Sequence, residues 1–132
     1  MEDVDKNYTF FRFEDLRVYH KALDYVEWVH SACTLFPESE MQNLTVKFTT
    51  TAQAIALQIA EGSSRNKPQF VYYLKLAKSS IRDCVVYTAL ALKLNYITEM
   101  SSDESRGQLM ELTKMIGALI GSLQRSANYE ER

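Results

Sequence analysis

Apolar residues recur at spacings of three and four along most of the chain, which is the period of an amphipathic α-helix. This periodicity predicts four helices, over residues 13–35, 40–62, 68–97 and 103–126. The expected core positions are Leu16, Tyr19, Leu23, Val26, His30 and Cys33 in the first helix, Met41, Leu44, Phe48, Ala52, Ile55 and Ile59 in the second, Phe70, Leu74, Ala77, Ile81, Cys84, Val85, Thr88 and Leu92 in the third, and Leu109, Leu112, Ile116, Leu119, Ile120 and Leu123 in the fourth.

The breaks between these segments carry residues that end or begin helices. Pro37 disfavours helix at the residue before it, Gly62 is a common stop, and Pro68 suits the first turn of the next helix. Ser101 and Glu104 have capping-box spacing at the start of the fourth helix. Because short connections favour antiparallel neighbours, we predict an all-α fold, an antiparallel up-down-up-down four-helix bundle over residues 11–126.

The ends of the chain are more polar than the rest. We expect residues 1–10 to form a disordered or extended arm and residues 127–132 a frayed tail. The 132 residues fit a single domain.

The third predicted helix has a second apolar face beyond the one a bundle needs, formed by Tyr72, Leu76, Tyr87, Leu90 and Leu94. The fourth carries Gly117 and Gly121, although glycine inside a helix costs about 1 kcal/mol relative to alanine. Close approach of another backbone would explain both glycines, and the alternative is that they are incidental. Since exposed apolar surface generally marks an interaction site, we expect a homo-oligomer, with a patch for a different partner as the alternative.

Basic residues gather at one place, although the formal net charge is −2 and the pI about 5.7. The candidate nucleic-acid contacts are Arg65, Lys67, Lys75, Lys78 and Arg82. Such a stripe could meet phosphates, and the alternative is a solvated helix edge. The negative net charge favours the solvated edge for a single subunit.

Residues for catalysis or metal binding do not converge in the sequence. His20 and His30 stand ten residues apart on one predicted helix and cannot share a metal ion within it, and no C-x-x-C or phosphate loop occurs. Cys33 and Cys84 lie in apolar stretches, which favours buried free thiols. We therefore expect no enzyme activity, cofactor or metal. The absence of an apolar leader or a long apolar run favours a cytoplasmic protein that does not bind membranes.

Several motifs resemble a known family, the bacterial four helix bundle or S23 proteins, encoded within 23S rRNA genes and by free-standing genes. The segment F-R-F-E-D-L-R-V-Y at residues 11–19 resembles the family's F-x-F-x-x-L-x-V-W opening, and F-P-E-S-E at 36–40 its F-P-x-x-E loop. The segment I-A-L-Q-I-A-E-G-S-S-R at 55–65 is similar to its most specific element, I-A-E-G-x-x-R, and residues 70–83 resemble F-x-x-x-L-x-x-A-K-G-S-L-x-E.

The resemblance covers about residues 11–125 and implies a four-helix bundle that assembles into a pentameric ring without catalytic residues. A relative, the accessory protein of diversity-generating retroelements, binds a reverse transcriptase and nucleic acid through a basic surface. Residues 47–52, K-F-T-T-T-A, stand where the family tends to have Q-L-R-R-A, which weakens the implication of nucleic-acid binding. We therefore expect a non-catalytic oligomeric scaffold for a protein or RNA partner, with a nucleic-acid-binding module as the alternative.

Overall fold

The computed structural model describes the backbone of residues 10–131 and the side chains of residues 10–126, and this part of the chain contains helices and no strand. Two short 3-10 helices, η1 (Arg12–Asp15) and η2 (Glu38–Glu40), accompany four α-helices. The α-helices are α2 (Arg17–Cys33), α3 (Leu44–Ser63), α4 (Lys67–Lys93) and α5 (Glu99–Glu131). The prediction of an all-α fold with four helices is confirmed. The expected arm falls almost wholly on residues 1–9, outside the described residues.

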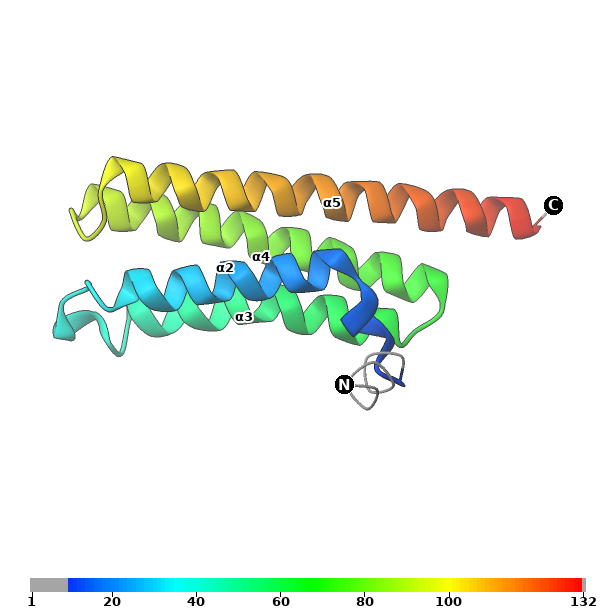
Figure 1. The fold of residues 1–132 in the computed structure, drawn as a ribbon, viewed down its shortest axis with the longest axis horizontal. Coiled ribbons are helices and arrows are strands. Elements are labelled where there is room, and N and C mark those ends of the chain that lie inside the picture. The colour runs from blue at the N-terminus through cyan, green and yellow to red at the C-terminus, as the bar shows by residue number, and fades with distance from the viewer. Residues whose placement is uncertain (1–9, 132) are drawn as a thin grey trace, which may run out of the picture.

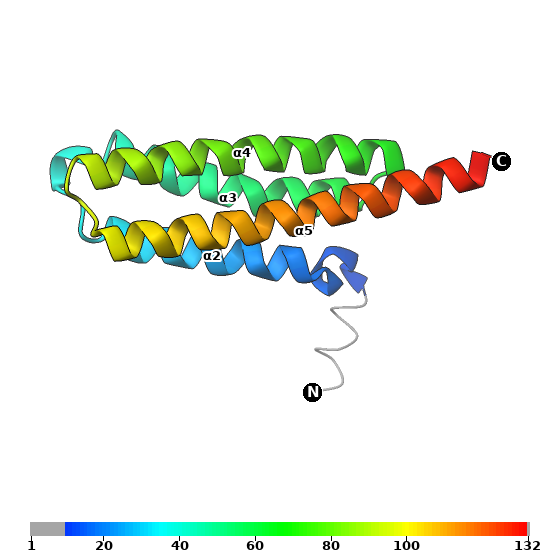
Figure 2. The same ribbon diagram turned by 90° about the horizontal axis from the view of Figure 1, so that it is seen from above.

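The four α-helices lie alongside one another around one core (Figures 1 and 2). Helix α2 packs against α3 and α5, and α4 packs against the same two helices. In Figure 1 the connections after α2 and α4 lie at the left end and the connection after α3 at the right end, so the chain traverses the bundle four times. All four helices contribute fully buried side chains, including Tyr25, Phe48, Ile55, Leu74, Leu109 and Ile116.

Helix α2 buries a different face from the one we predicted. The residues it buries are Val18, Ala22, Tyr25, Val29, Ala32 and Cys33. The predicted core residue Leu23 is 41% exposed, and His30 lies at the surface, where its ring nitrogen Nε2 is 3.2 Å from Nε2 of Gln53 on α3. Ala22 and Ala32 thus point into the core beside Tyr25, whereas Tyr19, Leu23 and Val26 line a groove beside α3.

The turns on either side of α3 also differ from the prediction at single positions. Met41, predicted as core, is 57% exposed because the chain forms η2 and a turn before α3 begins at Leu44. At the other end Gly62 has no positive φ, so it does not end α3 as a left-handed cap. Instead a Cβ at Gly62 would lie 2.7 Å from Cβ of Tyr73, which shows that glycine is needed for close packing of α3 against α4.

The connection from α4 to α5 lies four residues earlier than predicted, because α4 ends at Lys93 and α5 begins at Glu99. Asn95 adopts a positive φ of 63°, and the N–H of Tyr96 donates to the carbonyl of Ala91 at 2.9 Å, which is the usual left-handed end of a helix. The hydroxyl of Thr98 accepts from the N–H of Ser101 at 3.1 Å and caps α5. The capping box predicted at Ser101 is therefore wrong by one turn. Helix α5 also continues through residues 127–131, for which we expected a frayed tail.

Candidate interaction surfaces

The outer face of α4 carries exposed apolar side chains in two groups. Tyr72 near the start of the helix is 59% exposed, and Leu90 and Leu94 near its end are each 42% exposed. Val86, which the sequence analysis did not single out, is 62% exposed and lies one helical turn before Leu90. We name Tyr72, Val86, Leu90 and Leu94 the outer face of α4.

Two residues of the predicted interface, Leu76 and Tyr87, are only partly exposed. The ring of Tyr87 lies 5.7 Å from that of Phe48 on α3, so this tyrosine packs on the core of its own chain. The structure thus divides the predicted apolar face. Three of its five members are available at the surface, Leu76 is half-buried, and Tyr87 packs on the core.

The predicted glycines of α5 do not contribute to packing within the chain. A Cβ at Gly117 would meet nothing within 4 Å, and one at Gly121 would meet only the guanidinium of Arg125, at 3.1 Å. Gly117 lies one turn beyond Thr113, and Gly121 one turn further. Both therefore follow the side of α5 that borders α4.

The predicted basic residues are in different environments. A guanidinium nitrogen of Arg65 lies 3.4 Å from a carboxylate oxygen of Glu61, and the same group lies over the ring of Tyr73. The ammonium of Lys67 donates to the hydroxyl of Ser126 at 2.6 Å. Lys75 and Arg82 are exposed and Lys78 is half-buried. No single exposed stripe contains all five residues, and the nucleic-acid interface stays a prediction.

A groove between α4 and α5 has an apolar floor and a basic rim, and we name it the α4–α5 groove. Its volume is about 330 Å³. Its lining residues are Ile81, Arg82, Val85, Arg106, Leu109, Met110, Thr113 and Lys114. Sequence reasoning identified Arg82 but missed Arg106 and Lys114, which lie eight residues apart on α5. That spacing places them on one helix face, although each looks like an ordinary solvated charge until α4 lies beside it.

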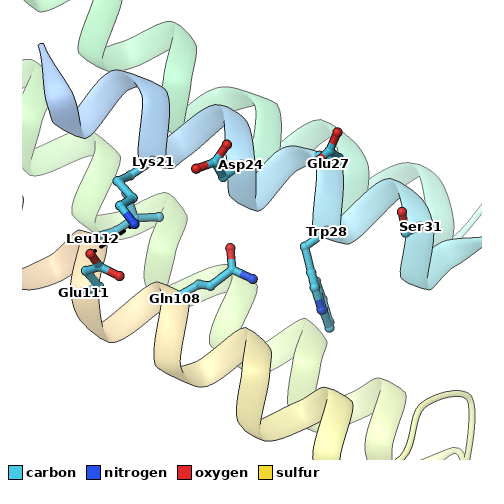
Figure 3. A pocket seen from close by; sticks show the side chains of 8 residues that line it. All are labelled: Lys21, Asp24, Glu27, Trp28, Ser31, Gln108, Glu111 and Leu112. Carbon is cyan, nitrogen blue, oxygen red and sulfur yellow. Dashed lines mark ion pairs between the residues drawn. The ribbon is translucent and has the colours of Figure 1, made fainter.

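A second groove, between α2 and α5, is lined mostly by polar residues, among them the carboxylates Asp24, Glu27 and Glu111 (Figure 3). Lys21 of α2 points toward Glu111 of α5, with 3.3 Å between its ammonium nitrogen and a carboxylate oxygen. The indole N–H of Trp28 donates to a carboxylate oxygen of Glu104 at 3.1 Å. Each of these side chains thus pairs across the two helices, which holds α2 against α5.

Buried polar groups serve to join helices. The hydroxyl of Ser105 on α5 lies 2.8 Å from the hydroxyl of Tyr25 on α2 and 2.7 Å from that of Thr88 on α4. Burial raises the pKa of the Tyr25 phenol well above its ordinary value. The three hydroxyls satisfy one another inside the bundle, which is a structural arrangement and offers no reactive group to solvent.

Other chemistry-bearing residues lie apart from one another in residues 10–126. Cys33 and Cys84 are buried free thiols, as predicted, and burial raises their pKa values to about 11 and about 12. No group of three side chains among these residues could hold a metal ion. No helix of the part of the chain that the structure describes is long and apolar enough to span a membrane.

Comparison with known proteins identifies a family and a protein of similar fold. The family described as "23S rRNA-intervening sequence protein" matches residues 14–118 of the chain. Among solved structures, a protein of unknown function from the S23 ribosomal protein family of Bacteroides thetaiotaomicron is similar in fold, with a TM-score of 0.71 and 18% sequence identity over 79% of this chain and 95% of that one. None of the curated proteins compared with the chain matches it.

Proposed function

Because the chain belongs to the 23S rRNA-intervening sequence protein family, we propose that it is a non-catalytic scaffold that works by assembling with copies of itself. In this proposal the chain is an antiparallel up-down-up-down bundle. Several copies close into a ring that presents the remaining surfaces to a partner. The outer face of α4 is the contact between copies.

The exposure of apolar side chains on the outer face of α4 carries this proposal. Fully burying a leucine- or valine-sized side chain contributes about 1.5–3 kcal/mol, and Tyr72, Val86 and Leu90 each leave roughly half of that unrealised in a single chain. A second copy supplies the cover without requiring any other gene product. A face that meets a different surface of the next copy produces a ring when the rotation closes.

The polarity of the buried residues supports a scaffold over an enzyme. The buried hydroxyls of Tyr25, Thr88 and Ser105 hydrogen-bond to one another, and both thiols are held protonated by burial at neutral pH. A nucleophile in an active site needs an adjacent base and an accessible reacting atom. Neither thiol meets both conditions.

Sedimentation velocity of charge variants tests the proposal at micromolar concentration. In the Val86→Glu/Leu90→Glu variant, each contact would bury unpaired carboxylates, so we expect a sedimentation coefficient well below that of the native protein with helical circular dichroism retained. Met41 and Met100, 57% and 74% exposed, provide the matched control Met41→Glu/Met100→Glu, with the same charge change away from this face.

The control variant should sediment like the native protein. The proposal fails if the native protein sediments as a single 15.2 kDa chain. It also fails if the outer-face variant and the control keep the same assembled state.

A further inference from the structure

The α4–α5 groove combines two properties that point to one kind of occupant. Its floor is apolar, formed by Ile81, Val85 and Leu109, and Met110 extends it outward with 56% of its surface exposed. Its rim is basic, with Arg82 on the α4 side and Arg106 and Lys114 on the α5 side. None of the lining residues is acidic.

We propose that the α4–α5 groove binds an amphipathic helix of another protein, one with an apolar stripe flanked by glutamates or aspartates. This inference rests on the proposed scaffold function and adds the chemistry of the partner. A helix of this kind places apolar residues at i, i+3, i+4 and i+7 on the floor of a groove. Its flanking carboxylates then lie near cations on both rims, which fixes the orientation of the helix and speeds its association.

The glycines of α5 extend the groove along the same side of the helix. Met110, Lys114 and Gly117 follow one another at spacings of four and three, and Gly121 comes one turn later. A Cβ at Gly117 would meet nothing of this chain within 4 Å. The lack of a side chain at Gly117 lets a docked helix approach the backbone of α5 closely, which explains one helix-weakening residue that the bundle itself does not use, whereas the guanidinium of Arg125 lies over Gly121.

The composition of the groove favours a helix over a nucleic acid. Single-stranded nucleic acids bind to basic grooves that also present aromatic side chains for base stacking, and no aromatic residue lines this groove. The apolar floor of the groove is separate from the contact proposed between copies, because at 100° per residue Leu90 lies about 140° around α4 from Val85. The two surfaces adjoin at Arg82, which lies one turn before Val86.

Binding of a synthetic peptide to the full chain tests the inference. The probe is a helix of about 18 residues, with leucine at i, i+3, i+4 and i+7 and glutamate between, long enough to hold helical structure. Two further probes separate the contributions: a scrambled peptide of the same composition, and an amphipathic peptide with lysine in place of glutamate. A single-stranded RNA serves as competitor at physiological salt.

Two variants locate the binding, and each has a control. Arg82→Glu/Arg106→Glu/Lys114→Glu reverses the rim, and Arg12→Glu/Arg17→Glu/Lys47→Glu applies the same charge change to exposed cations outside the groove. Gly117→Leu fills the extension of the groove, and Ser122→Leu is its control, because Ser122 is exposed and lies about 140° around α5 from Gly117. Sedimentation of the same samples reports the assembly separately.

We expect the acidic amphipathic peptide to bind at least about tenfold more tightly than either other peptide. Rim reversal and Gly117→Leu should each weaken it at least about tenfold, with both controls unchanged and the assembly intact. Equal binding of the three peptides, or unaltered binding in the rim variant, would overturn the inference. So would displacement of the peptide by RNA, or loss of assembly in the rim variant, which would make the groove a contact between copies. A monomeric native protein that still binds the peptide would refute only the proposed self-association.

Discussion

Replacement of Gly62 by alanine should destabilise the bundle, although the same change in most helices is stabilising. The new Cβ would lie 2.7 Å from Cβ of Tyr73 and 2.9 Å from Cδ1 of Phe70, both on α4. The Cβ of Tyr73 is fixed to its backbone and cannot rotate away, so α3 and α4 must separate near their connection. Overpacking of this kind costs about 1–3 kcal/mol, whereas exchanging glycine for alanine in a helix contributes up to about 1 kcal/mol. We therefore expect a net loss of about 1–2 kcal/mol for Gly62→Ala.

Gly107→Ala provides the comparison of opposite sign. Gly107 is exposed on α5, and a Cβ there meets nothing within 4 Å, so only the gain in helix propensity remains. Urea unfolding followed by circular dichroism measures both variants, at one fixed protein concentration because self-association adds to apparent stability. The two should differ by about 2–3 kcal/mol. A Gly62→Ala variant as stable as the native protein would show that the start of α4 can move away from α3 at no cost in free energy, and the packing argument would be wrong.

Three further predictions concern single contacts. Ser105→Ala leaves the buried hydroxyl of Tyr25 without its 2.8 Å partner and should lower the free energy of unfolding by about 1–3 kcal/mol; an unchanged urea midpoint would contradict this. Burial raises the pKa values of Cys33 and Cys84 to about 11 and about 12. A disulfide reagent at about pH 8 should therefore label both thiols only as fast as the chain unfolds, and immediate labelling of the native protein would refute this. The hydroxyl of Tyr96 donates to a carboxylate oxygen of Glu40 at 2.7 Å and lowers the pKa of that carboxyl. The stability that this hydrogen bond contributes is therefore present above the ordinary carboxyl pKa and is lost as the pH falls through the lowered value. The thermal midpoint of Tyr96→Phe should thus lie below that of the native protein at about pH 7 and approach it at about pH 3, whereas a difference independent of pH would count against the hydrogen bond.

Sequence periodicity predicted the core best where a helix is long and uninterrupted. In α4 the expected positions Phe70, Leu74, Ala77, Ile81, Cys84 and Thr88 are all buried. In α2 the prediction followed one stripe at spacings of three and four, including Tyr19, Leu23 and Val26, and these residues instead line a groove beside α3. The buried face of α2 contains Ala22 and Ala32, because a closely packed helix pair accommodates small residues. Val18, Ala22, Tyr25 and Val29 follow the same spacings of three and four, so spacing alone could not choose between two adjacent faces.

Local sequence patterns could not predict where α5 begins or which of its residues line a groove. Thr98 and Ser101 both have hydroxyls suited to capping, and the choice depends on the left-handed residue Asn95, which ends α4 early. Arg106 and Lys114 become a rim only when α4 brings Arg82 to the opposite side. Contacts of this kind join residues far apart in sequence, and neither helical period nor composition encodes them.

The mass of the native protein in solution tests the central claim most directly. Light scattering coupled to size exclusion, over a range of micromolar concentrations, should give a mass several times the 15.2 kDa of one chain, because the outer face of α4 is covered by a second copy. A mass of one chain across that range would contradict the proposal that the protein works as an assembled scaffold.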